Sequence, residues 1–174
     1  MFSMFKIVGI IFAFLASSLI GFMKSNEIKK RKQILEDFRE LINLISTRIG
    51  YFKEPLPVIF KTLLPETKDE AHSLLEKCLM AYEMGEKDIG NIWESSVKNV
   101  YSSTSIDEDD IKIISKCGQF LGQSDYESQK KHFKLIDYQM ERHIDDAEQQ
   151  VRTKGKMYSK IGVSLGVLIA IVLL

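Results

Sequence analysis

The sequence predicts an all-α protein, an antiparallel six-helix bundle flanked by an N-terminal and a C-terminal transmembrane helix. Apolar residues recur at steps of three, four and seven along the middle of the chain, and alternating strand patterns are essentially absent. Both ends are apolar and uncharged over stretches close to the length of a membrane helix. The predicted parts are an N-terminal transmembrane helix at 1–24, a cytoplasmic helical bundle at 25–155 and a C-terminal transmembrane helix at 156–174.

Composition excludes some classes of function. The 24 basic and 24 acidic residues give a formal net charge of zero, so we expect no nucleic-acid partner, because little would release counterions from a phosphate backbone. The two cysteines, Cys78 and Cys117, are far apart in the sequence and lie on apolar helical faces. We expect buried thiols in a reducing compartment, because a disulfide framework needs more cysteines in a smaller domain.

The N-terminal segment is predicted to be a retained membrane helix. Residues Ile7 to Met23 carry no charge, and a helix of that length covers roughly 26 Å, close to the hydrocarbon thickness. Lys6 precedes the segment as in a signal peptide, but no clear small-x-small cleavage site follows. Basic residues at Lys24 and at 29–32 come next, and positive charge holds that side in the cytoplasm.

The C-terminal segment is predicted to be the second anchor. Residues Ile161 to Leu174 carry no charge, and the apolar stretch extends back to Met157 if Lys160 reaches the headgroups. Basic residues at 152–156 again mark the cytoplasmic side. Both basic flanks adjoin the middle domain, so both chain ends are expected to cross outward into the lipid bilayer.

Gly162 and Gly166 form a GxxxG pattern in the second anchor and are our candidates for membrane-helix packing. Two small residues at this spacing let helices approach closely, which makes a homo-oligomer a hypothesis. The same pattern is also common by chance in apolar helices.

The first soluble helices are bounded by glycine and proline. The first is predicted from Asn26 to Ile49, with Gly50 as the residue that ends it. The connector Tyr51–Pro57 leads into a short helix from Val58 to Leu64. Proline suits a first helical turn, and Pro65 stops this helix.

Three capping boxes are predicted for later helices. The third helix starts at Thr67–Glu70 and ends before Gly85, and the fourth carries an apolar stripe from Ile89 to Val100. The fifth starts at Ser105–Glu108 and ends near 118–122.

The sixth helix is the longest. It starts at the capping box Ser124–Glu127 and meets no proline or glycine up to Gln150, so we expect it to be continuous with the C-terminal anchor. Its apolar stripe consists of Tyr126, Phe133, Ile136, Met140, Ile144, Ala147 and Val151.

Catalytic and metal-binding patterns are weak. The histidines His72, His132 and His143 are not spaced as a metal pair, and no HExxH, CxxC or glycine-rich phosphate loop occurs. His132 and His143 could each approach a carboxylate from another helix, but satisfied or surface histidines are favoured. The acidic run 107–110 falls in a first helical turn, where carboxylates favour the positive end of the dipole. We predict no enzyme, cofactor or metal, and we expect Trp93 to be a core anchor.

Three stretches resemble the stage III sporulation protein AB family of endospore-forming Firmicutes. Residues Leu121–His132, with the sequence LGQSDYESQKKH, are similar to its LGxSDxxxQxKH-type stretch. Residues Ile49–Pro57 are similar to its PLP element, and Lys154–Gly166 to its C-terminal signature. With the apolar N-terminus, the resemblance covers essentially the whole chain. One departure is Val58–Phe60, where the family has Ala/Glu-type positions.

The resemblance implies a non-enzymatic membrane platform subunit of a mother cell–forespore channel complex needed for endospore formation. The soluble domain of that family is similar to the cytoplasmic domain of type II secretion and type IV pilus platform proteins. By this analogy the chain docks a secretion-type sporulation ATPase to other membrane proteins, with its soluble domain on the mother-cell side. The alternatives are a homo-oligomeric membrane scaffold without an ATPase partner and a membrane-tethered enzyme.

The predicted docking surface lies at the end of the bundle farthest from the membrane. If the first and sixth soluble helices leave the membrane together, that end lies near Gly50 and Ser124. The candidate docking residues there are Lys53, Glu54, Gln123 and Asp125. The structural alternative is that the LGxSD stretch supplies a tight turn and a helix cap.

Overall fold

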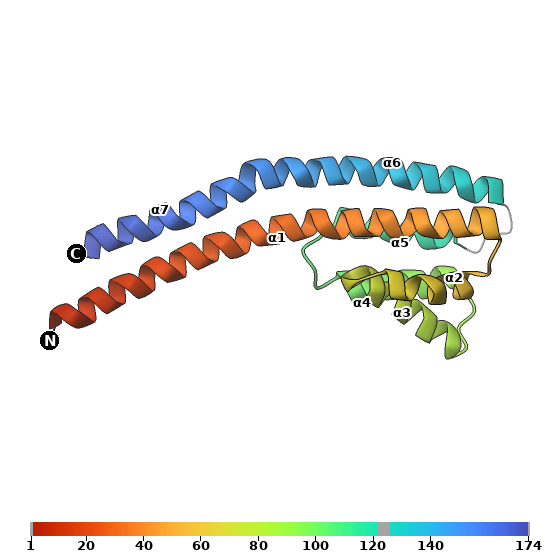
Figure 1. Cartoon of the computed structure of the whole chain (residues 1–174), viewed down its shortest axis with the longest axis horizontal. Coiled ribbons are helices and arrows are strands. Elements are labelled where there is room, and N and C mark those ends of the chain that lie inside the picture. Colours follow the sequence, from red (N-terminus) through yellow and green to blue (C-terminus); the bar gives the residue numbers. More distant parts are fainter. Residues whose placement is uncertain (1, 122–125, 174) are drawn as a thin grey trace. The chain divides into compact units, whose positions relative to one another are not determined.

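The computed structural model describes residues 2–121 and 126–173, and over these ranges the chain is all-α, with no strand (Figure 1). This confirms the predicted fold class. The chain divides into two compact units, one of residues 1–32 and 146–174 and the other of residues 33–145.

The helices follow one another closely in the sequence. They are α1 (Phe2–Phe52), α2 (Leu56–Leu63), α3 (Asp69–Glu83), α4 (Ile89–Tyr101), α5 (Glu108–Lys116), α6 (Tyr126–Gln150) and α7 (Lys156–Leu173). Two 3₁₀ turns, Leu64–Glu66 and Cys117–Gln119, and a π-helical turn, Val151–Gly155, complete the described elements. The π-helical turn joins α6 directly to α7, as the predicted continuity requires. The N-terminal and first soluble helices, predicted separately, are one helix, α1, because no glycine or proline separates them.

The unit 33–145 is a bundle of six helical segments among its described residues. Figure 1 shows α2, α3 and α4 together on one side of the second half of α1, with the first part of α6 on its other side. Apolar side chains from the predicted stripes are buried in the interior of this unit, where burial of apolar surface stabilises the fold. Fully buried examples from five of the helices are Leu35, Ile59, Leu74, Val97 and Met140.

Trp93 is the central side chain of this core. It is fully buried, and its Nε1 donates a hydrogen bond to the carbonyl oxygen of Ile114, 2.8 Å away. Its ring lies 6.2 Å from that of Phe38 and 6.3 Å from that of Phe60, measured between centroids. Trp93 therefore joins α1, α2, α4 and α5, which confirms it as a core anchor.

The end of α1 differs from the prediction. The helix continues through Gly50 to Phe52, and Lys53 leaves it in the left-handed conformation with a φ of 54°. Proline disfavours helical geometry in the residue before it, so Pro55 keeps Glu54 out of the helix. The chain therefore turns at Lys53, and Gly50 was the wrong choice for the residue that ends the helix.

The predicted capping box at Thr67–Glu70 is not formed. The N-cap residue of α3 is Lys68, which makes no side-chain cap hydrogen bond. The Thr67 hydroxyl donates instead to the carbonyl oxygen of Leu64 at 3.1 Å, so it closes the preceding 3₁₀ turn. The predicted end of α3 is confirmed, since Gly85 has a φ of 107° directly after it.

Both cysteines are buried and free, as predicted. Burial raises the pKa of the Cys78 thiol to about 11 and raises that of Cys117 as well. Both thiols therefore stay protonated and unreactive near neutral pH in the folded chain.

Replacing Gly118 should destabilise the bundle, because a Cβ there would lie 2.7 Å from Cδ1 of Trp93. We expect Gly118→Ala to lower the free energy of unfolding by about 1–3 kcal/mol through overpacking. Urea unfolding of the full chain in detergent micelles, followed by the fluorescence of its single tryptophan, measures this. The control is Gly9→Ala, because a Cβ at Gly9 meets nothing within 4 Å. Equal unfolding midpoints for the two variants would contradict the prediction.

Candidate functional site

The unit of residues 1–32 and 146–174 brings α7 against α1 through small residues. A Cβ on Gly162 would lie 2.9 Å from the Cα of Gly21, and the Ser17 hydroxyl donates to the carbonyl oxygen of Gly162 at 2.8 Å. A Cβ on Gly166 would lie 2.7 Å from the ring of Phe14. Both glycines of the GxxxG pattern therefore contact α1 of the same chain.

Two helical stretches, Val8–Phe52 and Glu127–Val172, each contain a segment long and apolar enough to cross a membrane. The side chains that α1 and α7 expose in these segments are large and apolar. They include Phe12, Leu15, Leu19, Ile20, Leu168, Ile171 and Val172. Such surfaces suit an apolar surrounding. The predicted boundaries near residues 24 and 156 stay predictions.

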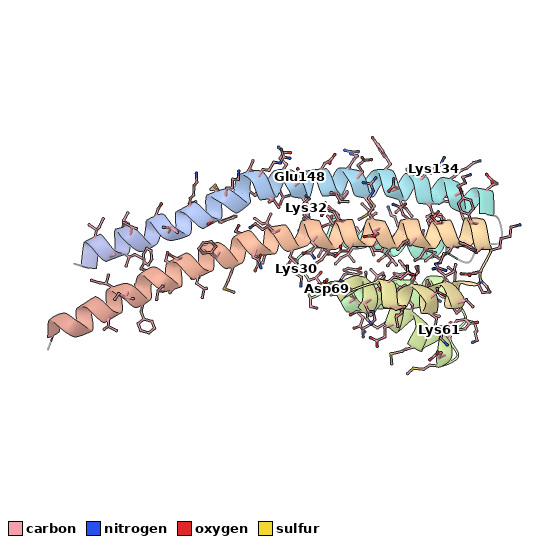
Figure 2. The ribbon with its side chains drawn as sticks, viewed as in Figure 1. Lys30, Lys32, Lys61, Asp69, Lys134 and Glu148 are labelled. Carbon is pink, nitrogen blue, oxygen red and sulfur yellow. The ribbon has the colours of Figure 1, made fainter. Side chains whose placement is uncertain are left out.

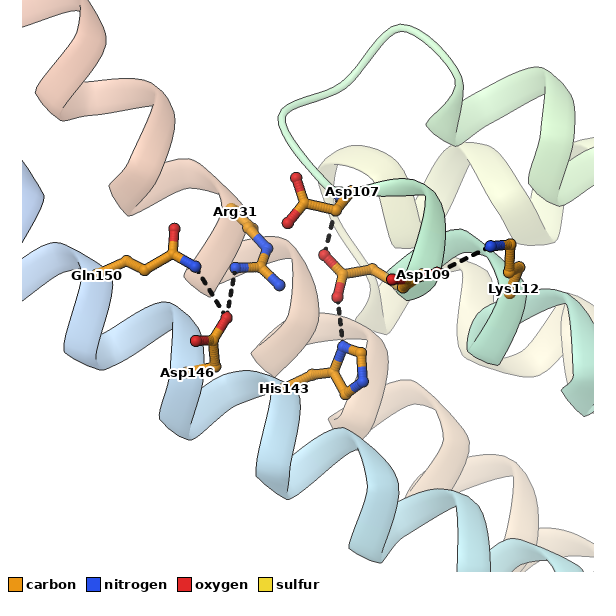
Figure 3. A network of polar contacts seen from close by, with 8 residues as sticks. Arg31, Asp107, Asp109, Lys112, His143, Asp146 and Gln150 are labelled. Carbon is orange, nitrogen blue, oxygen red and sulfur yellow. Dashed lines mark hydrogen bonds and ion pairs between the residues drawn. The ribbon is translucent and has the colours of Figure 1, made fainter.

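Part of the basic cluster at 29–32 is used in ion pairs within this unit. Nη1 of Arg31 lies 3.0 Å from Oδ2 of Asp146, which also accepts a hydrogen bond from Gln150 (Figure 3). The Arg31 side chain is only 7% exposed. Lys32 pairs with Glu148 at 3.4 Å. These contacts hold the end of α6 against α1, in addition to the topological role predicted for the cluster.

A buried carboxylate lies where α5 begins. Asp107 is the N-cap residue of α5 and forms a capping box with Asp110, which corrects the predicted box at Ser105–Glu108. Asp110 is fully buried, accepts the backbone N–H of Asp107 at 3.0 Å, and lies 2.6 Å from Nδ1 of His143 on α6. Figure 3 shows His143 reaching toward the start of α5. The acidic run 107–110 therefore lies at the start of α5, as predicted. In addition, Asp110 binds His143 and so connects α5 to α6.

The histidines have structural surroundings. Nδ1 of His72 lies 3.0 Å from the carbonyl oxygen of Leu64, and the ring of His132 stacks on Phe120 with 3.7 Å between centroids. Among the residues that the structure describes, no group of three or more His, Cys, Asp or Glu side chains could hold a metal ion. The arrangement around His143 is a helix-to-helix contact rather than a set of converging reactive groups.

Two of the four candidate docking residues can be placed. Lys53 is exposed at the turn after α1, whereas Glu54 is half-buried and lies 3.6 Å from Arg48, which also pairs with Glu66 at 3.5 Å. Glu54 therefore has a structural ion pair, and Lys53 is the freer of the two to meet a partner. Gln123 and Asp125 lie outside the described residues, as does Ser124 of the predicted capping box.

A groove of about 430 Å³ runs beside the end of α1, between α1 and the start of α6. Its lining is largely polar and consists of Asn43, Ser46, Thr47, Gly50, Tyr51, Lys130, Phe133, Lys134 and Asp137. Sequence reasoning missed this groove. Apart from Phe133, its residues lie outside the apolar stripes, and the periodicity of one helix does not predict its distance from another helix.

An arginine–carboxylate pair spans α1 and α6 next to this groove. Nε and Nη2 of Arg39 donate to the two carboxylate oxygens of Asp137 at 2.6 and 3.2 Å. The hydrogen bond from Arg39 holds the pKa of the Asp137 carboxyl below its usual range. Such two-point pairing fixes orientation as well as distance. The sequence did not predict this pairing, because the two residues are 98 positions apart and lie on different helices.

The described fold is an all-α bundle flanked by two candidate membrane-spanning helices. The chain belongs to the stage III sporulation protein AB family, whose sequence profile matches residues 6–174. The resemblance expected from the motifs is thereby confirmed, and the chain has a general role in sporulation.

One relative agrees with this assignment, and one solved structure agrees with the fold. Stage III sporulation protein AB of Bacillus subtilis (strain 168) is 25% identical over 171 residues, which cover 98% of this chain and 100% of that protein. A solved structure of stage III sporulation protein AB matches with a TM-score of 0.65 and 24% identity, over 70% of this chain and 96% of that chain. The second match supports the bundle fold.

Removing His143 should destabilise the bundle, because Asp110 would be left as a buried carboxylate without its partner on α6. We expect His143→Ala to lower the free energy of unfolding by about 3 kcal/mol, measured by urea unfolding of the full chain. Adding Asp110→Asn should restore part of the loss, since the amide keeps an acceptor for Asp107 without a charge. His132→Ala is the control and should cost about 1 kcal/mol or less. An unchanged unfolding midpoint for His143→Ala would contradict this structural role and make His143 a candidate functional residue.

Replacing Asp137 should change stability at neutral pH but not in acid. Because the folded-state pKa of Asp137 is lowered, its stabilising contribution is present above about pH 4, the ordinary pKa of aspartate, and is lost as the pH falls through the folded value. We expect Asp137→Asn to cost about 1 kcal/mol at pH 7, with the difference from the unaltered chain shrinking as the pH falls below about 4 and the Asp137 carboxyl takes up a proton. Thermal unfolding across this pH range measures it. Asp109→Asn, at an exposed carboxylate paired with Lys112, should leave the melting temperature nearly unchanged at every pH.

Proposed function

We propose that this chain is a non-enzymatic membrane platform subunit that docks a secretion-type ATPase to other membrane proteins of a channel complex between mother cell and forespore. The observation that carries the proposal is the family match over residues 6–174, which includes the bundle and both apolar helices together. A bundle attached to the membrane through both ends of the chain cannot diffuse away from it. A cytoplasmic motor then has a surface to push against.

The charge distribution supports a cytoplasmic bundle, and the mother-cell side is the part of the proposal that rests on the family alone. Basic residues follow the first apolar segment at Lys24 and 29–32 and precede the second at 152–160. Positive charge next to a membrane helix favours the cytoplasmic side. Both flanks adjoin the same bundle, so both helices would leave the cytoplasm outward from it.

The surface proposed for the ATPase is the end of the bundle that carries Lys53. Lys53 is exposed, and the polar groove between α1 and α6 opens beside the last turn of α1. Glu54, Gln123 and Asp125 complete the docking set that we propose, with Glu54 also engaged by Arg48. A partner that binds here would meet a polar surface with charges of both signs, on which Lys53 is an exposed cation.

The alternative, a homo-oligomeric scaffold held together by Gly162 and Gly166, has less support. Those glycines already contact Gly21 and Phe14 of the same chain. A contact between two copies through the same face would first have to separate α7 from α1. The platform is therefore the function we favour.

Charge reversal at Lys53 tests the docking surface. We expect Lys53→Glu to lower recovery of the ATPase at least several-fold when the full chain is cross-linked in sporulating cells and purified in detergent. The substitution leaves the Arg48–Glu54 pair in place and keeps a non-glycine residue at the turn. Lys68→Glu, at an exposed lysine before α3, is the matched control and should recover the ATPase normally.

Spore counts accompany the purification. Normal sporulation and normal ATPase recovery with Lys53→Glu would remove this surface from the proposal. Recovery of the chain alone by the unaltered protein, with the ATPase present in the lysate, would favour the scaffold.

A further inference from the structure

The unit of residues 1–32 and 146–174 carries an excess of positive charge. It contains ten basic and three acidic residues, a net charge of +7, whereas the unit 33–145 contains 14 basic and 21 acidic residues. Each of the three acids is paired with a cation of the same unit, in the pairs Lys24–Glu27, Arg31–Asp146, Lys32–Glu148 and Arg152–Glu148. Figure 2 shows Lys32 and Glu148 reaching toward each other from α1 and α6. No acid of this unit is therefore left to balance the other cations.

Four exposed lysines make up most of this surplus. They lie on α1 and around the start of α7, and we call them the lysine collar: Lys29, Lys154, Lys156 and Lys160. Within residues 2–121 and 126–173, none of the four has an ion-pair partner. The next acidic residues along the two helical runs are Glu36, roughly 10 Å from the collar along the helix axis, and Asp145, roughly 13 Å from it. Both distances exceed the Debye length of about 8 Å at physiological ionic strength.

Lys160 is level with the end of the first apolar segment. A Cβ on Gly21 would lie 2.7 Å from the carbonyl oxygen of Tyr158 and 3.0 Å from Cα of Gly162. Lys160 lies between these two α7 residues in the sequence, so it is at the height of Gly21 on α1. The uncharged run of α1 ends two residues later, at Met23. Charge therefore first appears at the same level on both helices.

The other lysines of the collar lie just beyond this level. A Cβ on Gly155 would lie 3.5 Å from Oγ of Ser25, so Lys154 and Lys156, the neighbours of Gly155, are level with Ser25. Lys29 follows Ser25 by four residues, roughly 6 Å along α1. The four lysines therefore occupy a band of roughly 12 Å that starts where the apolar surface ends. The sequence did not show this common level, because it depends on the register of α7 against α1.

The side chains next to the collar are apolar and exposed. Phe22 and Met23 on α1 are 57% and 59% exposed, and Met157 and Ile161 on α7 are 46% and 44% exposed. Exposed apolar side chains and exposed cations at one level match the boundary between the hydrocarbon core and the headgroups of a bilayer. Lysine suits this boundary, since its methylene stem can lie along apolar surface while its ammonium group reaches the headgroups.

We propose that the lysine collar binds the headgroups of anionic phospholipids, so that the chain gathers an anionic lipid shell around its two membrane helices. The positive-inside rule assigns these lysines to one side of the membrane but requires no particular lipid. The collar has no acid of its own unit left to bind and lies at the headgroup level, so lipid charge balances it. Each lysine close to an anionic surface strengthens binding about five-fold. The proposal rests on the membrane attachment in the proposed function and is independent of the ATPase.

The lipid selectivity of the full chain in bilayers tests the collar. The purified chain is reconstituted from detergent into phosphatidylcholine bilayers that contain a trace of spin-labelled phosphatidylglycerol or spin-labelled phosphatidylcholine. Electron paramagnetic resonance then gives the fraction of each labelled lipid that is immobilised against the protein. We expect a several-fold preference for phosphatidylglycerol at low salt. The preference should nearly vanish at about 1 M salt, where the Debye length falls to about 3 Å.

Charge variants locate the selectivity. The collar variant should lose most of the preference for phosphatidylglycerol and carries Lys29→Gln, Lys154→Gln, Lys156→Gln and Lys160→Gln. The matched control should keep the preference and carries glutamine at four exposed lysines of the unit 33–145, namely Lys61, Lys68, Lys98 and Lys116. Arginine at all four collar positions should also keep it, because the attraction depends on positive charge. An unaltered emission maximum of Trp93, which is buried in the bundle, shows that each variant is folded.

The same spectra separate the collar from the membrane attachment. Immobilised lipid without a headgroup preference in the unaltered chain would overturn the collar alone. So would a preference that the collar variant keeps or that the control variant loses. No immobilised lipid of either kind would show that the helices are not embedded in the bilayer. The attachment on which the proposed function depends would then fail together with the collar.

Discussion

A carboxylate with no exposed surface is the most demanding constraint in the bundle, since an uncompensated buried charge destabilises a fold by several kcal/mol. Asp110 meets this constraint with the backbone N–H of Asp107 and the ring of His143. Both contacts require Asp107 to be the N-cap residue of α5 and His143 to lie opposite the first turn of α5. The hydrogen bond from Trp93 of α4 to Ile114 of α5 then fixes α4 relative to α5. One buried acid therefore sets the register of three helices.

The charges of the chain fall into two groups with different consequences. Arg39 with Asp137, and Arg48 with Glu54, join two elements and are partly withdrawn from solvent. The lysines of the collar are exposed, and those on α7 lie beside exposed apolar side chains. Pairs of the first kind orient helices within the chain. Charges of the second kind are available for contacts outside it, where complementarity selects the partner.

The π-helical turn at Val151–Gly155 explains how one helical run keeps the same face on α1 in the unit of residues 1–32 and 146–174. A π turn accommodates one extra residue, which rotates all later side chains by about 100° relative to an unbroken α-helix. Ala147 is fully buried before the turn. After it, a Cβ on Gly155 would lie 3.5 Å from Oγ of Ser25, and Gly162 meets Gly21. The π-helical turn therefore places Ala147, Gly155 and Gly162 on the same face of the helical run.

The sequence by itself determined the helices, the apolar ends, the burial of Trp93 and of both cysteines, and the family. These properties follow from periodicity and from the removal of apolar surface from water, and both are local to each segment. Tertiary structure alone decided the cap at Asp107, the left-handed turn at Lys53 and the pairing of Arg39 with Asp137. In the site, Lys53 was placed correctly at an exposed turn, while the structural tie of Glu54 to Arg48 was missed. Polar partners lie in different helices, and each choice depends on which faces the packed core brings within hydrogen-bond distance, which no single helix specifies.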